Sequence, residues 1–424
     1  YGSKFHTLKQ NRGQQGIGIS AAVLYSQLTT GKATKIYSRI SPKKTAHYFE
    51  LQIDTKKNEP NVLIDKEVNW DKDHGTKIEL ELEGRYLKGK QSVDEYVKET
   101  AIVNPHATFI YITPEKEKFT YQNVTEELPH EAKEIKPHPY GIELGQLIKM
   151  LQDTRVDTLQ GFLRSEFSRI GQQTAQEICS KAKLKTDEKP KKLDDKQVEF
   201  LFRALQESKI MAPPSDCLSP ITAELLEKGL RKEIQADFYV TTTRAPSVYR
   251  GMPFIIEVGI AYGGELEKES QVRVMRLANR VPLLYQQGAC AITEAVSETG
   301  WKSYELQQSG NNLPVGPAII LVHIASVWVP FTNEAKEAIA HYDEIIKEIK
   351  LALQECGRKL SIYIHKHIKA AEQRDKISLF EKYIPELANS LSNITDYKKD
   401  LLQEKLQKLL KKELPNLESE NEKK

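Results

Sequence analysis

Residues 12–22 read Arg12-Gly13-Gln14-Gln15-Gly16-Ile17-Gly18-Ile19-Ser20-Ala21-Ala22, a glycine-rich run that passes directly into an apolar, helix-compatible stretch. The three glycines let the backbone approach a ligand closely and adopt conformations that other residues avoid. The free amides at the start of the following helix form an anion site that suits a nucleotide phosphate. The run is therefore a candidate phosphate-binding loop.

Length and composition indicate a charge-rich protein of two to four domains. The chain has 424 residues, of which 39% are hydrophobic and 29% charged, and its formal net charge is only +3. Any contact with nucleic acid must therefore come from local basic patches. We find no apolar run of membrane-spanning length and no signal peptide, so we expect a cytoplasmic protein with no membrane partner.

The cysteines and histidines predict no metal site. The four cysteines are widely spaced and form no C-x-x-C or Cys/His cluster, so we expect buried free thiols in a reducing compartment. His365 and His367 are two residues apart and would point to different faces of a helix. No Ser/His/Asp or Cys/His catalytic constellation stands out either.

Residues 1–135 read as a helix followed by strands. Apolar and polar residues alternate over 45–54 and 76–83, with turn signals between them at 58–60 and 70–75. A helix near 93–97 and a strand at 107–112 complete an α+β layer. Beyond the stiff loop Lys136-Pro137-His138-Pro139-Tyr140 only helices are expected, at 142–153, 157–170, 174–182 and 194–208.

The strand pattern returns after residue 213. We expect strands at 236–243, 254–262, 272–277 and 318–329, with a helix at 289–299 between the last two. If these two strands are parallel neighbours, the β-α-β crossover should be right-handed. One long helix is predicted from an N-cap at Thr332-Asn333 towards Ala371. A further lysine-rich helical stretch follows at 377–414, and we expect a disordered tail at 418–424.

Several of these stretches together resemble a known family. Tyr1-Gly2-Ser3-Lys4-Phe5-His6, the run 12–18 and Ala21-Ala22-Val23-Leu24-Tyr25-Ser26-Gln27 are similar to the ATP lid of the B subunits of archaeal-type DNA topoisomerase VI. These belong to the GHKL superfamily, with gyrase B, the ninety-kilodalton heat-shock chaperones, MutL and histidine kinases. The segments Lys136-Pro137-His138-Pro139-Tyr140-Gly141 and Gly300-Trp301-Lys302-Ser303-Tyr304 also match, so that the resemblance covers essentially the whole chain.

The resemblance implies an α+β multidomain fold in four parts. Residues 1–135 would be the C-terminal part of a Bergerat-type (GHKL) ATPase α/β sandwich, and 136–215 a helix-two-turn-helix domain. Residues 216–372 would be an S5-like β-α-β transducer domain with a long stalk helix, followed by C-terminal helices and a tail at 373–424. Because Tyr1 lies in mid-motif, we expect the chain to be the C-terminal part of a longer product.

The resemblance also implies the residues of an ATP site. The expected cofactor-binding residues are Ser3, Lys4, Gly13, Gln14, Gln15, Gly16, Ile17, Gly18, Ile19, Ser20, Thr76 and Lys302. Lys302 would reach the γ-phosphate from the second domain and act as a sensor of nucleotide state. Thr76 could equally be a strand-entry residue with no role.

Two further segments are candidate DNA contacts. The basic loop with Arg85, Lys88 and Lys90 contains a glycine and could meet a phosphate backbone, although solvated surface charge is the plainer interpretation. The stretch 168–175 reads as helix, glycine turn, helix and is similar to the helix-two-turn-helix module of the family. A plain helical hairpin is the alternative there.

Two motifs of the superfamily belong upstream of the lid: a Glu-Asn-x-x-Asp helix that supplies the general base and holds Mg²⁺, and an Asp-x-Gly-x-Gly strand end that reads adenine. We therefore expect no catalytic residue in this chain and no ATP hydrolysis by the chain alone. The resemblance implies an ATP- and Mg²⁺-dependent type IIB topoisomerase subunit that dimerises on ATP binding. Its partners would be double-stranded DNA and an A subunit, in an A2B2 heterotetramer that relaxes supercoils by strand passage.

Two other classes of protein stay open at this point. A chaperone or mismatch-repair ATPase of the same superfamily would share the lid but not the helical insert at 142–210. A DNA-binding protein that uses no nucleotide would account for the helical module and leave Gly13 to Gly18 without a role.

Overall fold

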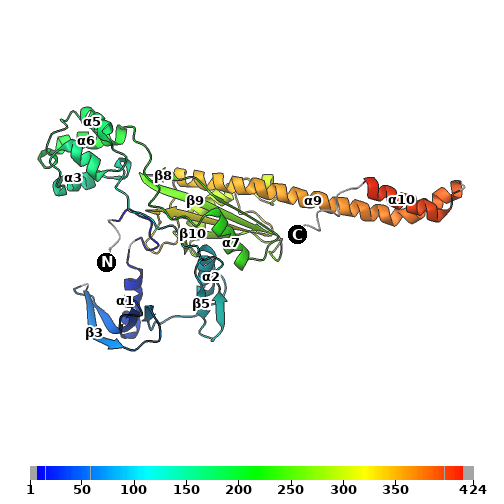
Figure 1. Cartoon of the computed structure of the whole chain (residues 1–424), viewed down its shortest axis with the longest axis horizontal. Coiled ribbons are helices and arrows are strands. Elements are labelled where there is room, and N and C mark those ends of the chain that lie inside the picture. Colours follow the sequence, from blue (N-terminus) through cyan, green and yellow to red (C-terminus); the bar gives the residue numbers. More distant parts are fainter. Residues whose placement is uncertain (1–6, 15, 58, 396, 414–424) are drawn as a thin grey trace.

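A six-stranded sheet with a very long helix across it forms the centre of the chain (Figure 1). The computed structural model describes residues 7–14, 16–57, 59–395 and 397–413. The strand order is β11-β10-β12-β9-β7, and β8 pairs with β9. The strands are β7 (Phe238–Thr243), β8 (Ser247–Tyr249), β9 (Met252–Tyr262), β10 (Arg273–Ala278), β11 (Val281–Pro282) and β12 (Ala318–Ser326).

The predicted β-α-β unit is present in this sheet. Strands β10 and β12 are parallel, and the helix α8 (Ala291–Ser297) lies between them in the chain, while the other pairings are antiparallel. Every residue of β12 is buried, as expected for a continuous apolar strand that is covered on both faces. One helix of this region, α7 (Ala223–Glu233), was not predicted from the sequence.

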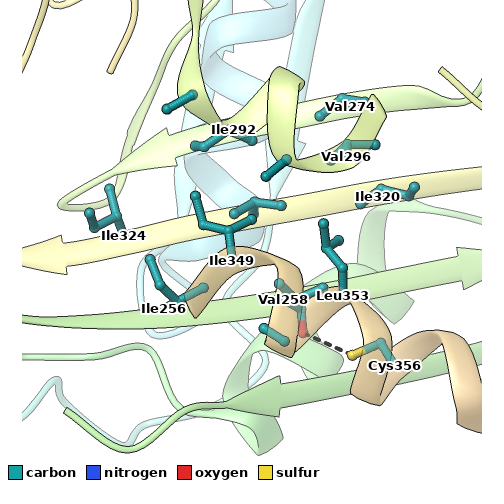
Figure 2. Close-up of a cluster of buried hydrophobic side chains, with 14 of the residues drawn as sticks. Ile256, Val258, Val274, Ile292, Val296, Ile320, Ile324, Ile349, Leu353 and Cys356 are labelled. Atoms are coloured by element: carbon teal, nitrogen blue, oxygen red, sulfur yellow. Dashed lines mark hydrogen bonds between the residues drawn. The ribbon is translucent and has the colours of Figure 1, made fainter. Parts of the chain in front are cut away.

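Alternate residues of the central strands point into two different cores. In β12, Ile320, Val322 and Ile324 pack with α8 and with the first half of the helix α9 (Asp343–Ile394), as Figure 2 shows in part. Ile319 and Leu321 face the opposite way, towards α7 and α2 (Val93–Val103). The period of two along each strand therefore gives the sheet a helix layer on each face.

The long helix differs from its prediction at both ends. It begins at Asp343 rather than near Thr332, because residues 331–339 form a loop closed by a β-bridge between Phe331 and Ile339. It then continues as far as Ile394 with Pro385 inside it, and α10 (Lys399–Glu413) packs beside its distal part (Figure 1). In the part of the chain that the structure describes, no helix is long and apolar enough to cross a membrane.

Four helices with a common core form a separate lobe (Figure 1). They are α3 (Leu144–Asp153), α4 (Leu159–Glu166), α5 (Gln172–Lys181) and α6 (Asp195–Glu207). Short 3₁₀ turns at η1 (Pro139–Gly141) and η2 (Pro190–Lys192) precede α3 and α6. The predicted helix at 157–170 is shorter than expected, because the chain extends at Phe167 (φ −113°, ψ 147°).

The N-terminal part contains a second, four-stranded sheet of order β3-β2-β1-β4. Its elements are α1 (Gly18–Thr30), β1 (Thr34–Arg39), β2 (Ala46–Asp54), β3 (Glu59–Val68) and β4 (Gly75–Glu79), and the hairpin β5 (Phe109–Ile112) and β6 (Lys118–Tyr121) follows α2. The turn predicted at 58–60 was wrong from Glu59 onwards, since Glu59 and Pro60 begin β3. Proline is tolerated there because β3 is an edge strand.

Helix α2 belongs to the sequence region of this N-terminal part but packs on the central sheet. Its Ile102 and Val103 are fully buried in one cluster with Leu226 and Leu230 of α7. The close approach requires Gly229, since a Cβ at that position would lie 2.0 Å from the Ile102 carbonyl oxygen. The two α/β parts are thus joined by direct helix packing.

Candidate functional site

A cavity of about 790 Å³ lies where the glycine-rich run meets the central sheet. Four segments line it: the run itself, the loop that leads into α2, the end of the β10–β11 hairpin, and the loop between β12 and α9. They lie within 12–18, 85–96, 281–285 and 334–337. The cavity is therefore built from parts of the chain that are remote from one another in sequence.

The helix α1 begins at the wall of this cavity with its amides uncapped. Ile17 is the N-cap, no side chain of the described residues caps the helix, and its first turn contains no acidic residue. The first backbone bond inside the helix is donated by Ala21 to the Ile17 carbonyl, so the amides of Gly18, Ile19 and Ser20 have no acceptor within the helix. Such an end carries partial positive charge and suits an anion.

A lysine from the opposite side of the cavity approaches the same run. The Lys336 Nζ lies 3.5 Å from the Arg12 carbonyl oxygen and 5.8 Å from the centre of the Phe331 ring. Among the described residues no carboxylate pairs with it, and burial lowers the pKa of its ammonium. A partly desolvated cation without a counter-ion is well placed to meet an anionic ligand.

The loop that carries Lys336 is held in a defined shape. Lys336 has a left-handed backbone (φ 59°), and Asn333 accepts from its amide and bonds the Glu337 side chain. Arg276, which is almost fully buried, donates to the carbonyls of Leu283 and Tyr285 and to that of Glu337. The loop is therefore tied to the β10–β11 hairpin, which forms another wall of the cavity.

Below this loop, a buried polar network anchors the hairpin turn. His323 contacts Glu257 (Nδ1 to Oε2, 2.8 Å) and accepts at Nε2 from the Arg280 amide (3.0 Å). Burial would raise the pKa of Glu257, but the hydrogen bonds from His323, the Ile221 amide and Thr243 lower it. The Arg280 side chain in turn donates to the carbonyls of Val103 and Pro220, so it joins the ends of α2 and α7 to this turn.

Part of the expected phosphate loop lines the cavity. Gly13, Gly16, Ile17 and Gly18 are in its wall, and Gly16 has the left-handed backbone (φ 66°) that favours glycine. Ile19 and Ser20 form the first turn of α1 behind them. The Gln14 side chain turns away from the cavity, where it is buried against Val329. The predicted residues Ser3, Lys4 and Gln15 lie outside the described residues.

The structure does not bring Thr76 or Lys302 to this cavity. Thr76 is exposed in β4, where it pairs with Ser38. Lys302 lies in the 3₁₀ turn η4 (Trp301–Tyr304), which packs on α9 at Gly357. At about 1.5 Å per residue, Gly357 is roughly 20 Å along α9 from the helix start. The predicted sensor role of Lys302 therefore has no support from the geometry of the cavity.

The basic loop is divided between the cavity and the surface. Arg85 lines the cavity with Tyr86, whose hydroxyl donates to Asp94 at 2.7 Å. Lys88 is paired with two carboxylates, Glu115 (2.6 Å) and Glu117 (2.9 Å), whose hydrogen bonds raise the pKa of the lysine. Lys90 is exposed. The loop is thus less basic towards solvent than its sequence suggests.

The glycine turn of the helical lobe faces another group of cations. Gly171 is the N-cap of α5, and a cavity beside it is also lined by Lys133, Lys136 and Arg164, together with the acidic residues Glu134 and Asp216. Arg169, with a left-handed backbone (φ 61°), donates to the Ala212 carbonyl. Among the described residues no group of three or more His, Cys, Asp or Glu side chains could hold a metal ion.

Two cations of the cavity, Arg12 and Lys336, were not predicted from the sequence. Arg12 is the first residue of the run, directly before Gly13, and this position could have indicated its role. Lys336 was hidden because residues 332–341 were read as the first turns of the long helix, where it would have been one more solvated lysine.

Comparison with known proteins shows the family to which the chain belongs. Residues 213–376 match the family model described as the transducer of the topoisomerase VI B subunit. The B subunit of type 2 DNA topoisomerase 6 from Metallosphaera sedula is 37% identical over 414 residues, which cover 96% of this chain and 77% of that protein. The chain belongs to the family of topoisomerase 6 B subunits.

Other members of the topoisomerase 6 B family are more similar in sequence. The proteins of Methanococcoides burtonii and Methanosarcina mazei are 52% and 51% identical to this chain over 93% of its length. The chain spans 63% and 64% of these two relatives. Among solved structures, the gyrase B protein from Myxococcus xanthus covers 82% of this chain and 71% of its own, at 9% identity and a TM-score of 0.36, which is too low to support an argument.

Proposed function

We propose that this chain is the ATP-binding and force-transmitting part of a type II DNA topoisomerase that relaxes supercoiled DNA by passing one duplex through another. The observation that carries the proposal is the cavity in which the uncapped start of α1 faces Lys336 and Arg12. Free helix amides and two cations fit a polyphosphate, and family membership makes ATP the expected one.

In this proposal the phosphates lie on the amides of Gly18 to Ser20, with the glycine-rich run folded over them. Lys336 approaches from the far wall and is attracted more strongly to a triphosphate than to a diphosphate, because the terminal phosphate carries the additional charge. We propose Lys336, rather than Lys302, as the residue that senses the terminal phosphate. Magnesium would neutralise the phosphate oxygens.

The position of Lys336 suggests how nucleotide state reaches the rest of the assembly. The loop that carries it leads directly into α9, which runs 52 residues away from the cavity. A change in this loop would therefore act on the base of a long lever. We propose that the lever transmits ATP-driven dimerisation of two B subunits to an A subunit that cleaves DNA, in an A2B2 assembly.

The finer domain assignments belong to the same proposal. We infer that α1, α2 and the four-stranded sheet are part of a Bergerat-type ATPase sandwich, and that the lobe α3–α6 is a helix-two-turn-helix module that contacts DNA. The uncapped glycine N-terminus of α5, with lysines and an arginine beside it, supports a phosphate contact there. Residues 216–372 would be the S5-like transducer and its stalk.

The test uses the full-length protein with its A subunit and supercoiled plasmid. Relaxation should require both ATP and Mg²⁺, and the Lys336→Ala protein should keep DNA binding while losing most ATP-dependent relaxation. Relaxation without nucleotide, or an undiminished rate in Lys336→Ala, would contradict the proposal. The isolated chain should bind ATP without hydrolysing it.

A further inference from the structure

The glycine-rich run is fastened to the central sheet by a buried side-chain amide. Gln14 is 7% exposed, and its Nε2 donates to the Val329 carbonyl (3.3 Å) while its Oε1 accepts from the Val329 amide (3.0 Å). The side chain thus pairs with the backbone of Val329 at two points, although the two residues are remote in sequence. A two-point bond fixes orientation as well as distance.

We propose that Gln14 is a positioning residue that couples the nucleotide-binding run to the Lys336 loop, so that both respond to the terminal phosphate as one unit. The inference rests on the proposed ATP site, and it adds a residue whose side chain touches neither nucleotide nor cavity. Its effect passes through Val329 to the loop that follows β12.

The places of the two partners in the chain support this coupling. Gln14 lies between Gly13 and Gly16, which both line the cavity. Val329 lies two residues before Phe331, whose ring is beneath the Lys336 ammonium and whose backbone forms the bridge that closes the Lys336 loop. Any displacement of the run must therefore move the base of this loop or break two buried hydrogen bonds, and buried backbone groups are costly to leave unpaired.

Two neighbouring contacts hold the same segment against the hairpin turn. The Asn279 side chain donates to the Asn11 carbonyl (3.1 Å), and Arg12 donates to the Arg280 carbonyl (3.2 Å). Neither reaches the Lys336 loop. The run also meets this loop directly, where the Lys336 Nζ donates to the Arg12 carbonyl (3.5 Å) in an exposed contact. The Gln14–Val329 pair is the buried, two-point contact between the run and the base of the loop, and it is the one to which we assign the coupling.

The chain offers a matched control four residues away. Gln10 makes the same two-point pairing with the backbone of Ser219: Nε2 donates to the carbonyl (3.2 Å) and Oε1 accepts from the amide (2.6 Å). Ser219 lies ahead of α7 and does not line the cavity. Gln10→Met and Gln14→Met thus remove the same kind of bond from the same segment, but only the second one concerns the Lys336 loop.

The experiment measures amide hydrogen exchange by mass spectrometry in the presence and absence of the non-hydrolysable ATP analogue AMP-PNP with Mg²⁺. In the wild-type protein, the analogue should slow exchange in 16–22 and also in 331–341. Gln14→Met should keep the protection of 16–22 and lose that of 331–341, with exchange at Val329 about tenfold or more faster even without nucleotide. Gln10→Met should keep both protected regions.

Protection of 331–341 that survives in Gln14→Met would overturn the coupling while leaving the ATP site intact. Loss of that protection in Gln10→Met as well would show a general loosening of the segment and would also overturn it. Failure of the wild-type protein to gain protection at 16–22 would instead refute the proposed ATP site, and with it the inference.

Discussion

The close approach of α2 and α7 allows the sharpest prediction of stability. Gly229 lies in the middle of α7, and a Cβ built there would be 2.0 Å from the Ile102 carbonyl oxygen and 3.0 Å from its carbon. Ordinary contact begins at 3.4 Å, so Gly229→Ala must push the two helices apart until the overlap with the carbonyl oxygen is relieved. The Cβ clashes with backbone, and rotation of a side chain cannot relieve it.

Two opposing effects determine the expected magnitude. Replacing glycine by alanine inside a helix stabilises it by about 0.5–1 kcal/mol. Separating a packed interface costs about 1–3 kcal/mol, and the upper half of this range applies because the end of α2 is held by the Arg280 bond to Val103. Such a separation also forfeits much of the dispersion between Ile102 and Leu230. We expect a net loss of about 1–2.5 kcal/mol.

Urea unfolding combined with hydrogen exchange over 93–103 measures the effect of Gly229→Ala. The midpoint should fall, and exchange in α2 should accelerate. The control is Gly145→Ala in α3, because a Cβ there meets nothing within 4 Å, and it should leave stability unchanged or raise it by up to about 1 kcal/mol. A Gly229→Ala protein as stable as wild type would refute the close packing of the two helices.

Three further predictions concern charge. Burial raises the pKa of Glu99 to about 6 against the opposing effect of Arg273. Because the folded pKa exceeds the unfolded one, the free energy of unfolding should decrease by up to about 2 kcal/mol as the pH rises from 4.5 through 6. Glu99→Gln should abolish this decrease, as measured by urea titrations at successive pH values. Burial raises the pKa of the Cys356 thiol to about 12, so iodoacetamide at pH 8 should label it only after unfolding. Equal labelling rates in the folded and the unfolded protein, measured by mass spectrometry, would argue against its burial. Replacing Glu115 and Glu117 by Gln frees Lys88 from its two ion pairs. If the basic loop contacts DNA, fluorescence anisotropy should show tighter DNA binding and a salt dependence that is steeper by about one phosphate contact. Unchanged DNA binding would show that this loop does not contact DNA.

Helices and strands could be predicted where the pattern of apolar residues shows directly which of their side chains are buried. Strand β12 is a continuous apolar run that is buried on both faces, and such a run leaves little choice of structure. The amphipathic helices of the lobe were predicted because the apolar residues on one side of each helix are all buried in one shared core. The helix between β10 and β12 was predicted, but the sequence left open whether the two strands are neighbours, and their parallel pairing appears only in the structure.

Tertiary contacts decide most of the features that were not predicted from the sequence. Helix α7 has local helix signals, an N-cap at Thr222 and basic residues in its last turn, and it was missed among the strands predicted around it. The reason for a glycine at position 229, in contrast, appears only in the contact with α2. Residues 332–341 have the composition of a helix start, but the bridge from Phe331 to Ile339 and the buried Arg276 hold them as a loop. No local pattern indicates that such a loop will face the glycine run, which is remote from it in sequence.

The same distinction applies to the candidate site. The glycines and the start of α1 could be recognised because a phosphate loop is local in sequence. The cation opposite them comes from a remote segment, so neither spacing nor composition could select Lys336 over Lys302. The choice between these two lysines depends entirely on the three-dimensional arrangement.

The most direct measurement is therefore the affinity of the protein for Mg²⁺-AMP-PNP, by isothermal titration calorimetry, in the wild type and two single-lysine variants. The Lys336→Ala protein loses one charged contact to the terminal phosphate, so its affinity for Mg²⁺-AMP-PNP should be roughly tenfold to a hundredfold lower than that of the wild type. Lys302→Ala, whose lysine lies beside α9 and away from the cavity, should bind like wild type. Unchanged affinity in Lys336→Ala together with a loss in Lys302→Ala would contradict the account of the site.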